Sequence, residues 1–266
     1  MSRLQEAVGA LAARDGIGVA PYVTAGDGGL ERTRLVLHAL ERAGSTCVEL
    51  GIPFSDPIAD GPALQEAAQR SLEAGTSLEG VLEMVSTYRS EGGTLPILAF
   101  TYANPLVRRG SAAAVGMLAD AGVDGLLVPD LPVEESEDLF GEARSQGLST
   151  VAFVTPTTSE ERARRAAEAS SGFLYVIGRL GITGARTELG ADTVAYLDRI
   201  RSLSKVPLGV GFGLAAPDQV RALRGSATLA IVGTALVRHI HAVGSDDVAA
   251  AEAARAFVGE LVAATR

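Results

Sequence analysis

A glutamate inside an apolar segment is the first candidate for chemistry in this sequence. Glu49 lies in the run of residues 46–51, which has the composition of a buried strand. Burying an ionisable side chain costs several kcal/mol unless the group is paired or functional. Strand alternation puts Glu49 on the same face as Cys47, while Val48 and Leu50 point the other way towards helices. We therefore expect Glu49 to be an acid–base group facing an interior, the alternative being a glutamate paired with a buried arginine.

An aspartate in the loop that follows is the second candidate. Residues 52–62 contain three prolines and two aspartates, so the loop is stiff and polar. Asp60 precedes Gly61 and Pro62, where a new helix is expected to begin. Its position alone leaves two interpretations open, a turn or helix cap and a catalytic carboxylate.

Glycine-rich loops follow the last three predicted strands, at residues 178–185, 211–213 and 233–235. Glycine allows backbone N–H groups to approach an anion closely. Such loops favour a phosphate site, and ordinary tight turns are the alternative. Asn104 and Asp130 follow the third and fourth predicted strands, and we expect each mainly to fix its own loop.

The scarcity of some side chains narrows the chemistry further. Lys205 is the only lysine, and it precedes the seventh predicted strand instead of following one, so it is badly placed for a Schiff base. The three histidines, His38, His239 and His241, fall in predicted helices, away from strand ends where metal ligands converge. No dinucleotide fingerprint is present. These features favour a metal-free, cofactor-free reaction of carboxylates on a phosphorylated substrate.

The elements that must position these residues alternate between strands and helices. Continuous apolar runs, typical of parallel strands buried on both faces, predict eight strands. They span residues 18–24, 46–51, 96–101, 125–129, 150–155, 173–177, 208–211 and 229–232. Helical spacing recurs at residues 30–43, 111–121, 133–146, 159–170 and 191–204, and residues 1–16 predict an additional amphipathic N-terminal helix. This order predicts an α/β fold, a single (β/α)8 TIM barrel over residues 1–266, with a doubly wound open sheet as the alternative.

Composition excludes several classes of partner. The 266 residues carry a formal net charge of −9, which argues against a nucleic-acid or anionic-membrane surface. No apolar run is long enough to span a bilayer. The only cysteine, Cys47, allows no internal disulfide and fits a reducing compartment, so we expect a cytoplasmic protein.

Several motifs together resemble the tryptophan synthase α subunit family. The most specific is residues 48–62, which reads VELGIPFSDPIADGP. Further similar stretches occur in the family's order: Tyr22-Val23-Thr24-Ala25-Gly26-Asp27, Tyr102-Ala103-Asn104-Pro105, Val128-Pro129-Asp130-Leu131-Pro132, Gly181-Ile182-Thr183-Gly184 and Gly211-Phe212-Gly213. The resemblance spans nearly the whole chain. The sequence departs from the family pattern at Gly28, where proline is usual, and at Gly178, Ala215 and Thr234, where serine is common. None of these positions is a catalytic carboxylate.

The resemblance implies a retro-aldol cleavage of indole-3-glycerol phosphate into indole and glyceraldehyde 3-phosphate. In that family, the residue matching Glu49 does the acid–base work, and the residue matching Asp60 binds the indole N–H. Thr183 would close over the site and meet Asp60. The resemblance places these residues at the indole ring: Tyr22, Phe100, Leu127 and Tyr175. It places Gly184, Gly213, Gly233 and Thr234 at the phosphate, with Phe212 among the substrate-binding residues.

The same resemblance implies a partner and leaves alternatives open. A β subunit carrying pyridoxal phosphate would complete an α2β2 heterotetramer, and this chain would hold no cofactor or metal itself. The alternatives are a stand-alone lyase that releases indole, a non-catalytic activating subunit, and a different phosphosugar barrel enzyme. The presence of both Glu49 and Asp60 argues against the non-catalytic alternative.

Overall fold

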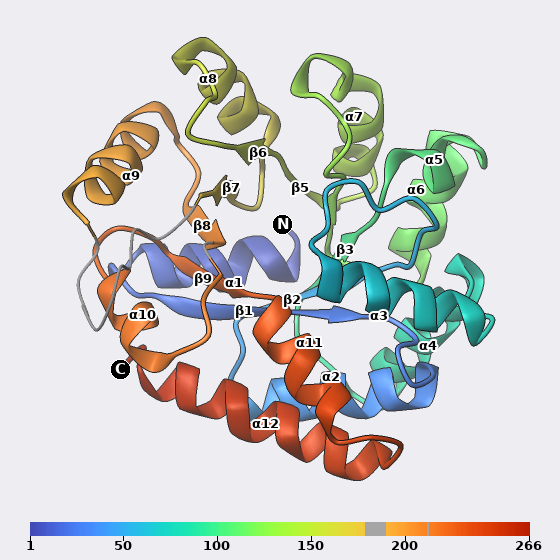
Figure 1. Cartoon of the computed structure of the whole chain (residues 1–266). Coiled ribbons are helices and arrows are strands. Elements are labelled where there is room, and N and C mark those ends of the chain that lie inside the picture. The colour runs from blue at the N-terminus through green and yellow to red at the C-terminus, as the bar shows by residue number, and fades with distance from the viewer. Residues whose placement is uncertain (179–189, 212) are drawn as a thin grey trace.

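A closed parallel barrel forms the centre of the molecule. The computed structural model describes residues 1–178, 190–211 and 213–266. In that part of the chain, the strands follow the order β5-β4-β3-β2-β1-β9-β8-β7-β6, and neighbouring strands pair in parallel (Figure 1). Their bounds are β1 Gly18–Thr24, β2 Val48–Gly51, β3 Ile97–Phe100, β4 Gly125–Leu127, β5 Ser149–Val151, β6 Phe153–Val154, β7 Leu174–Ile177, β8 Leu208–Gly211 and β9 Leu229–Val232. The predicted TIM barrel is confirmed, and the open doubly wound sheet is wrong.

The barrel closes through a strand that breaks in the middle. We predicted one strand over residues 150–155, but the structure divides it at Ala152. The Ala152 N–H donates to the Ser170 hydroxyl at 3.0 Å, and its carbonyl accepts from the Tyr175 N–H at 2.9 Å. As a result β5 pairs with β4 and β6 pairs with β7. Because the backbone of Ala152 changes its hydrogen-bond partner, one segment of chain pairs with β4 on one side and β7 on the other. The apolar sequence of this segment gives no sign of the break.

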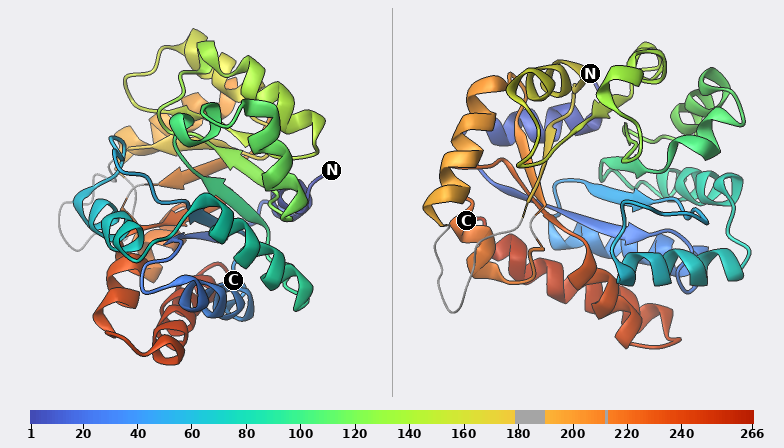
Figure 2. Two further views of the ribbon diagram at one scale, coloured as in Figure 1. Left: turned by 90° about the vertical axis from the view of Figure 1, so that its right-hand side faces the viewer. Right: turned by 45° about the horizontal axis from the view of Figure 1, so that its top comes forward.

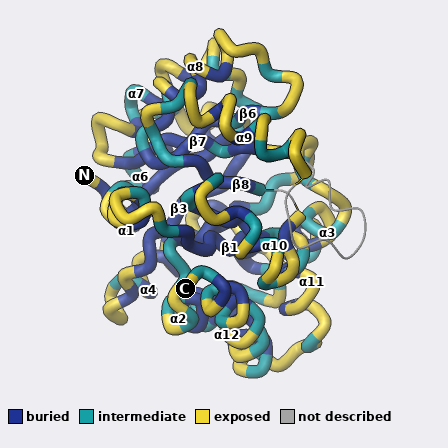
Figure 3. The backbone as a smooth tube through the Cα atoms, turned by 90° about the vertical axis from the view of Figure 1, so that its left-hand side faces the viewer, coloured by how far each residue is buried: buried dark blue, intermediate teal, exposed yellow. Residues whose placement is uncertain are grey.

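Strand alternation sorts the apolar side chains into two layers. The outer layer lies between strands and helices and includes Val48 and Leu50. The inner layer fills the barrel and includes Cys47, Leu98 and Leu229. Figure 3 shows that the buried chain is concentrated in the strands and the exposed chain in the surrounding helices and loops. Since Glu49 lies between Val48 and Leu50, the predicted inward orientation of its strand position agrees with this layering.

Helices surround the barrel on all sides, as two further views show (Figure 2). They are α2 Leu30–Ala43, α3 Pro62–Glu73, α4 Leu78–Ser90, α5 Ala103–Val107, α6 Ser111–Asp120, the 3₁₀ turn η1 Val133–Glu135, α7 Glu137–Ser145, α8 Glu160–Ala169, α9 Ala191–Leu203, α10 Pro217–Ala222, α11 Thr234–Ala242 and α12 Asp247–Ala263. The helix predicted over 133–146 therefore begins as a 3₁₀ turn. No helix in the described ranges is long and apolar enough to cross a membrane.

The predicted N-terminal helix closes the bottom of the barrel. It forms α1 over Arg3–Ala12, shorter than the predicted 1–16, and begins with a capping box between Ser2 and Gln5. Its apolar side chains Leu4, Val8 and Leu11 belong to the inner layer. In Figure 1, α1 accordingly crosses the middle of the barrel. The opposite end, where the strands terminate, is left for a site.

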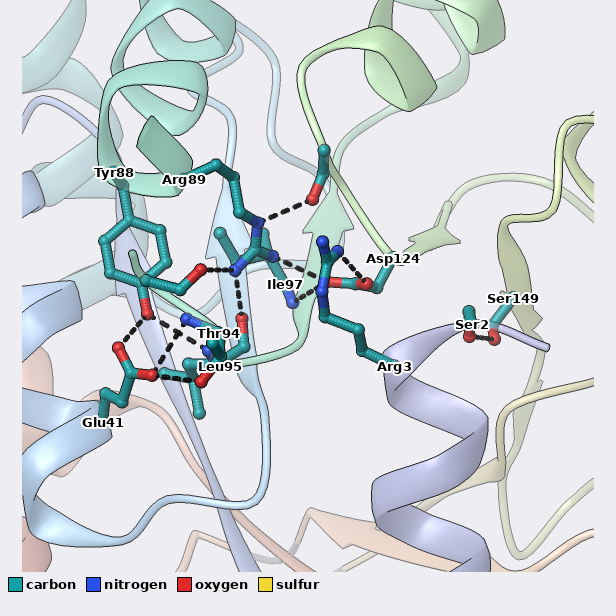
Figure 4. Close-up of polar contacts among 12 residues, drawn as sticks. Ser2, Arg3, Glu41, Tyr88, Arg89, Thr94, Leu95, Ile97, Asp124 and Ser149 are labelled. Carbon is teal, nitrogen blue, oxygen red and sulfur yellow. Dashed lines mark hydrogen bonds and ion pairs between the residues drawn. The ribbon is translucent and has the colours of Figure 1, made fainter. Parts of the chain in front are cut away.

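A buried aspartate ties α1 to the start of the strands (Figure 4). Asp124 is 3% exposed and accepts from Arg3 at 2.9 Å, from Arg89 at 2.7 Å and from the Ile97 N–H at 2.8 Å. Burial lowers the pKa of Arg89. Arg89 also donates to backbone carbonyls, including Gly122 at 3.0 Å. This network fixes the closed end of the barrel at a distance from the strand termini.

Candidate active site

Glu49 is a buried carboxyl group without a partner in the part of the chain that the structure describes. It lies in β2, where it is in register with Tyr22 of β1 on one side and Leu98 of β3 on the other. Its side chain is 1% exposed, and its Oε1 atom has no hydrogen-bond partner among the described residues. Desolvation raises the pKa of Glu49 to about 8. Within the described chain no arginine pairs with this group, so the alternative of an ion-paired structural glutamate is wrong there.

Asp60 occupies a different environment at the end of the β2–α3 loop. The N-terminal cap of α3 is Gly61, and no side chain caps this helix, so Asp60 is not a helix cap. The side chain is half-buried. Burial raises the pKa of Asp60 to about 6, and the nearby Tyr102 hydroxyl opposes that rise. At neutral pH Asp60 is therefore mostly ionised, while Glu49 is mostly protonated.

Two tyrosines of the barrel interior lie close to both carboxyl groups. The charges of Asp60 and Glu49 add to burial in raising the pKa values of Tyr22 and Tyr175, so both hydroxyls stay neutral. Glycines make room for these hydroxyls. A Cβ added at Gly51 would come within 2.0 Å of the Tyr22 hydroxyl, and one at Gly211 within 2.6 Å of the Tyr175 hydroxyl. No side chain fits at either position unless the tyrosine moves.

Aromatic and aliphatic side chains line the space around Glu49. The rings of Tyr22 and Phe100 meet edge to face at a centroid distance of 5.4 Å. The Tyr175 ring packs on Phe153 at 4.8 Å and on Phe173 at 6.2 Å. Leu127, in register with Phe100, is fully buried in the same inner layer. The structure thus brings four predicted pocket residues together, and this apolar lining suits a flat aromatic ring.

The glycines predicted to bind phosphate follow two adjacent strands. Gly213 comes after β8, is exposed and has a φ of 70°, a left-handed conformation that glycine adopts readily. Gly233 comes after β9 and is the N-cap residue of α11, whose first residue is Thr234. No side chain caps this nine-residue helix. Its free N–H groups and positive dipole end favour an anion.

Three predicted site residues lie outside the described residues. They are Thr183, Gly184 and Phe212. Their expected contacts with Asp60 and with phosphate remain predictions.

Most of the remaining candidate residues fix loops or lie away from the strand termini. Asp130 Oδ1 accepts from the Ala103 N–H at 2.9 Å and so fixes the neighbouring loop, as expected. Asn104 is exposed on α5. Lys205 lies between α9 and the start of β8, away from the strand termini. The three histidines lie on α2 and α11, and in the described ranges no three His, Cys, Asp or Glu side chains are grouped to hold a metal ion.

Sequence reasoning missed three side chains of this region. Phe153 and Phe173 were hidden in apolar runs that predict strands without indicating which residues pack on Tyr175. Tyr102 was part of a noted motif but had no role, because its contact with the Asp60 loop links two different strands. Sequence spacing carries no signal for such a contact.

One departure from the family pattern has a local explanation. Gly28 has a φ of 85°, which proline cannot adopt because its ring holds φ near −65°. A Cβ at Gly28 would also lie 2.4 Å from the Arg32 guanidinium. Arg32 is 7% exposed and pairs with Asp247 of α12 at 2.7 Å. The glycine thus accommodates a buried ion pair outside the candidate site.

Known proteins share both the sequence and the fold. A family model described as tryptophan synthase alpha chain matches residues 9–266. The alpha chain of Thioalkalivibrio sulfidiphilus is 42% identical over 267 residues, covering 100% of this chain and 98% of the relative. The alpha subunit of Legionella pneumophila superposes with a TM-score of 0.89 and 32% identity, covering 100% and 98% of the two chains. A Pyrococcus furiosus chain, from a structure addressing mutual activation of its α2β2 complex, gives a TM-score of 0.85 and 36% identity over 92% and 98%.

Proposed function

The chain belongs to the tryptophan synthase alpha chain family, and we propose that Glu49 and Asp60 perform the cleavage that this family catalyses. The reaction is the lyase step of tryptophan biosynthesis, in which indole-3-glycerol phosphate is cleaved. The proposal rests on the different environments of the Glu49 and Asp60 carboxyl groups. Glu49 is buried, has no partner among the described residues and has a pKa of about 8, whereas Asp60 is half-buried and has a pKa of about 6.

The two carboxyl groups divide the proton transfers between them. Protonated Glu49 donates its proton to C3 of the indole ring, and the positive charge then develops on the ring nitrogen. Ionised Asp60 accepts a hydrogen bond from the indole N–H and stabilises that charge. The C3–glycerol bond breaks as its electron pair returns to the ring. The glycerol hydroxyl becomes the aldehyde and gives its proton to the Glu49 carboxylate, which regenerates the acid.

The surrounding residues position the substrate for this step. Tyr22, Phe100, Leu127 and Tyr175 enclose the indole ring and keep water from Glu49, which maintains its raised pKa. The phosphate binds to the N–H groups near Gly213 and at the start of α11, at Gly233 and Thr234. Thr183, Gly184 and Phe212 are proposed to complete the site. Residues 1–266 act as one catalytic domain.

The chain works in a complex with a β subunit. We place it in the cytoplasm and propose that it uses no cofactor, with pyridoxal phosphate bound by the β subunit. Exposed apolar side chains at the strand termini support docking at this end of the barrel. Ile58 is 80% exposed beside Asp60, and Val107 is 62% exposed at the end of α5. A cavity of about 770 Å³ lies between the Asp60 loop and α3.

The test is indole release from indole-3-glycerol phosphate by the purified chain. Glu49→Gln keeps the shape of the side chain but has no proton to donate, so kcat should fall by about 10²–10⁴-fold or more. Asp60→Asn keeps a hydrogen-bonding group but cannot balance the charge, so kcat should fall steeply as well. Asp56→Asn is the matched control, because Asp56 is exposed in the same loop. A tenth of the wild-type kcat remaining in Glu49→Gln would reject the assigned role.

Dependence on the partner is tested in the same assay. Docking that favours a closed site would raise kcat by about 10–100-fold, since loop closure excludes water and completes the site. The measurement is kcat with and without a saturating β subunit. A high and unchanged kcat would instead favour the stand-alone lyase.

A further inference from the structure

Tyr102 connects the loop that carries Asp60 to a different strand. It follows β3, is 2% exposed and is the N-cap residue of α5, with extended backbone at φ −85° and ψ 160°. Its side chain therefore leaves the end of one strand and meets the loop that leaves the neighbouring strand, β2.

The contacts of Tyr102 reach both ends of the Asp60 loop. Its hydroxyl accepts a hydrogen bond from the Ala59 N–H at 3.1 Å, one residue before Asp60. The same hydroxyl also lies near the Asp60 carboxylate, and its influence lowers the pKa of Asp60 against the rise caused by burial. Its ring stacks on Phe54 at a centroid distance of 5.3 Å and an interplanar angle of 29°.

The other hydrogen bonds of this loop are local. Within the described residues, the Ile58 and Asp60 N–H groups bond to carbonyls two and three residues earlier. Gln65, in the first turns of α3, donates to the Asp60 carbonyl at 2.9 Å. None of these bonds ties residues 54–60 to the barrel. Tyr102 provides that attachment.

We propose that Tyr102 is a positioning residue that holds the Asp60 carboxylate above Glu49 for cleavage. This inference rests on the proposed role of Asp60. The hydroxyl accepts from the Ala59 N–H, which fixes the backbone beside Asp60. Its own proton is then available to the nearby carboxylate of Asp60, the group that faces the indole N–H. A displaced carboxylate would still allow substrate to bind but would stabilise the developing charge less well.

The same hydroxyl favours the ionised form of Asp60. It opposes the rise that burial imposes on the pKa of Asp60. Burial, and then the charges of Asp60 and Asp130, raise the pKa of Tyr102, which stays neutral. Among the described residues, the Asp60 charge also acts on Tyr22 and Tyr175, both of which have raised pKa values. Removing the Tyr102 hydroxyl should therefore raise the pKa of Asp60.

The chain contains a matched control at the other end of the barrel. The Tyr88 hydroxyl accepts from the Leu95 N–H at 3.2 Å and donates to Glu41 at 2.6 Å (Figure 4). It thus joins a backbone N–H to a carboxylate, as Tyr102 does. Tyr88→Phe removes the same atoms from the same kind of arrangement, away from the strand termini. A purely structural loss should look alike in both variants.

The experiment compares Tyr102→Phe with Tyr88→Phe in the full chain. Tyr102→Phe should lower kcat by about 10–100-fold, the range for losing a hydrogen bond to a charged group, while KM changes by less than about threefold. The acid limb of the pH profile of kcat/KM should move above about 6. Tyr88→Phe should leave kcat and the profile unchanged. Carboxyl ¹³C shifts, assigned with Asp60→Asn, measure the Asp60 pKa independently of turnover.

Each outcome decides between the two proposals. If Tyr102→Phe matches Tyr88→Phe in kcat, acid limb and Asp60 pKa while Asp60→Asn is inactive, the positioning role is overturned and the role of Asp60 stands. If Asp60→Asn keeps wild-type kcat, the proposed function of Asp60 fails and the inference fails with it. If Tyr102→Phe causes no further loss of kcat when it is combined with Asp60→Asn, the two effects are not additive and the inference is supported.

Discussion

Replacing Glu49 with glutamine should make the protein more stable at neutral and alkaline pH while it abolishes turnover. Glu49 is 1% exposed, and burial raises its pKa from an ordinary 4.5 to about 8. In the unfolded chain the carboxyl group ionises near 4.5. Between these two values the folded state binds one more proton than the unfolded state. The stability of the wild type therefore falls as pH rises through this window.

The size of this loss follows from the two pKa values. Each pH unit between them is worth about 1.4 kcal/mol, because that is the free energy of a tenfold change in proton binding. The wild type thus loses about 3 kcal/mol by pH 7 and about 4 kcal/mol by pH 8. Glutamine has no titratable proton and escapes the loss. Its unpaired amide costs about 1–3 kcal/mol at every pH, which shifts the curve but not its slope.

The assay is urea unfolding of the wild type and Glu49→Gln at several pH values between 5 and 8. The variant should be the less stable protein near pH 5 and the more stable one near pH 8. Glu252→Gln is the control, because Glu252 is exposed on α12 and bonded to Arg255 at 2.5 Å. It should show no gain that grows with pH. A constant difference between Glu49→Gln and wild type across this range would refute the buried, protonated glutamate.

Three further predictions concern the site and the closed end of the barrel. The pH profile of kcat/KM should rise as Asp60 ionises near 6 and fall as Glu49 loses its proton near 8; a profile with one limb would contradict the division of roles. Aspartate and asparagine both adopt a φ of 70° more readily than most residues, so Gly213→Asp and Gly213→Asn strain the backbone alike. Only the aspartate repels phosphate. KM should therefore be at least about tenfold higher in the aspartate variant, and an analogue without phosphate should not distinguish the two. Asp124→Asn leaves the buried Arg89 unpaired and should lower the free energy of unfolding by about 3–5 kcal/mol with kcat unchanged; urea unfolding and the indole assay measure both.

The strands most clearly predicted by the sequence are those with uninterrupted apolar runs. Residues 18–24, 208–211 and 229–232 form β1, β8 and β9 with the expected bounds. A strand that is buried on both faces needs apolar side chains at every position. The continuous apolar run in the sequence therefore predicts the strand and its bounds. The break at Ala152 depends on a hydrogen bond from the Ser170 side chain, which comes from the next unit of the barrel. Composition contains no information about that partner.

The helices between β2 and β3 were only half predicted. A helix was expected to begin after Asp60, and α3 does begin at Pro62. A second helix, α4, follows after Gly75, whose φ of 82° ends the first, and Ser77 caps its start. Gly75 and Ser77 are local signals of a helix end and a helix start, but the sequence analysis did not predict α4 from them. Tyr102 is a different case, because its role depends on two loops that only the closed barrel brings together.

The absence of a cation near Glu49 is as important to the site as the carboxyl group itself. The sequence contains 22 arginines, enough to pair every buried carboxylate, and Asp124 at the closed end has two of them. In the described chain none reaches Glu49, and burial alone accounts for its raised pKa. An arginine there would lower the pKa, as it does at Glu134 beside Arg162, and would remove the proton that C3 must receive. The same barrel thus uses paired carboxylates where it needs stability and an unpaired one where it needs an acid. That contrast also explains why Glu49→Gln should become more stable than the wild type as pH rises, whereas Asp124→Asn should be less stable.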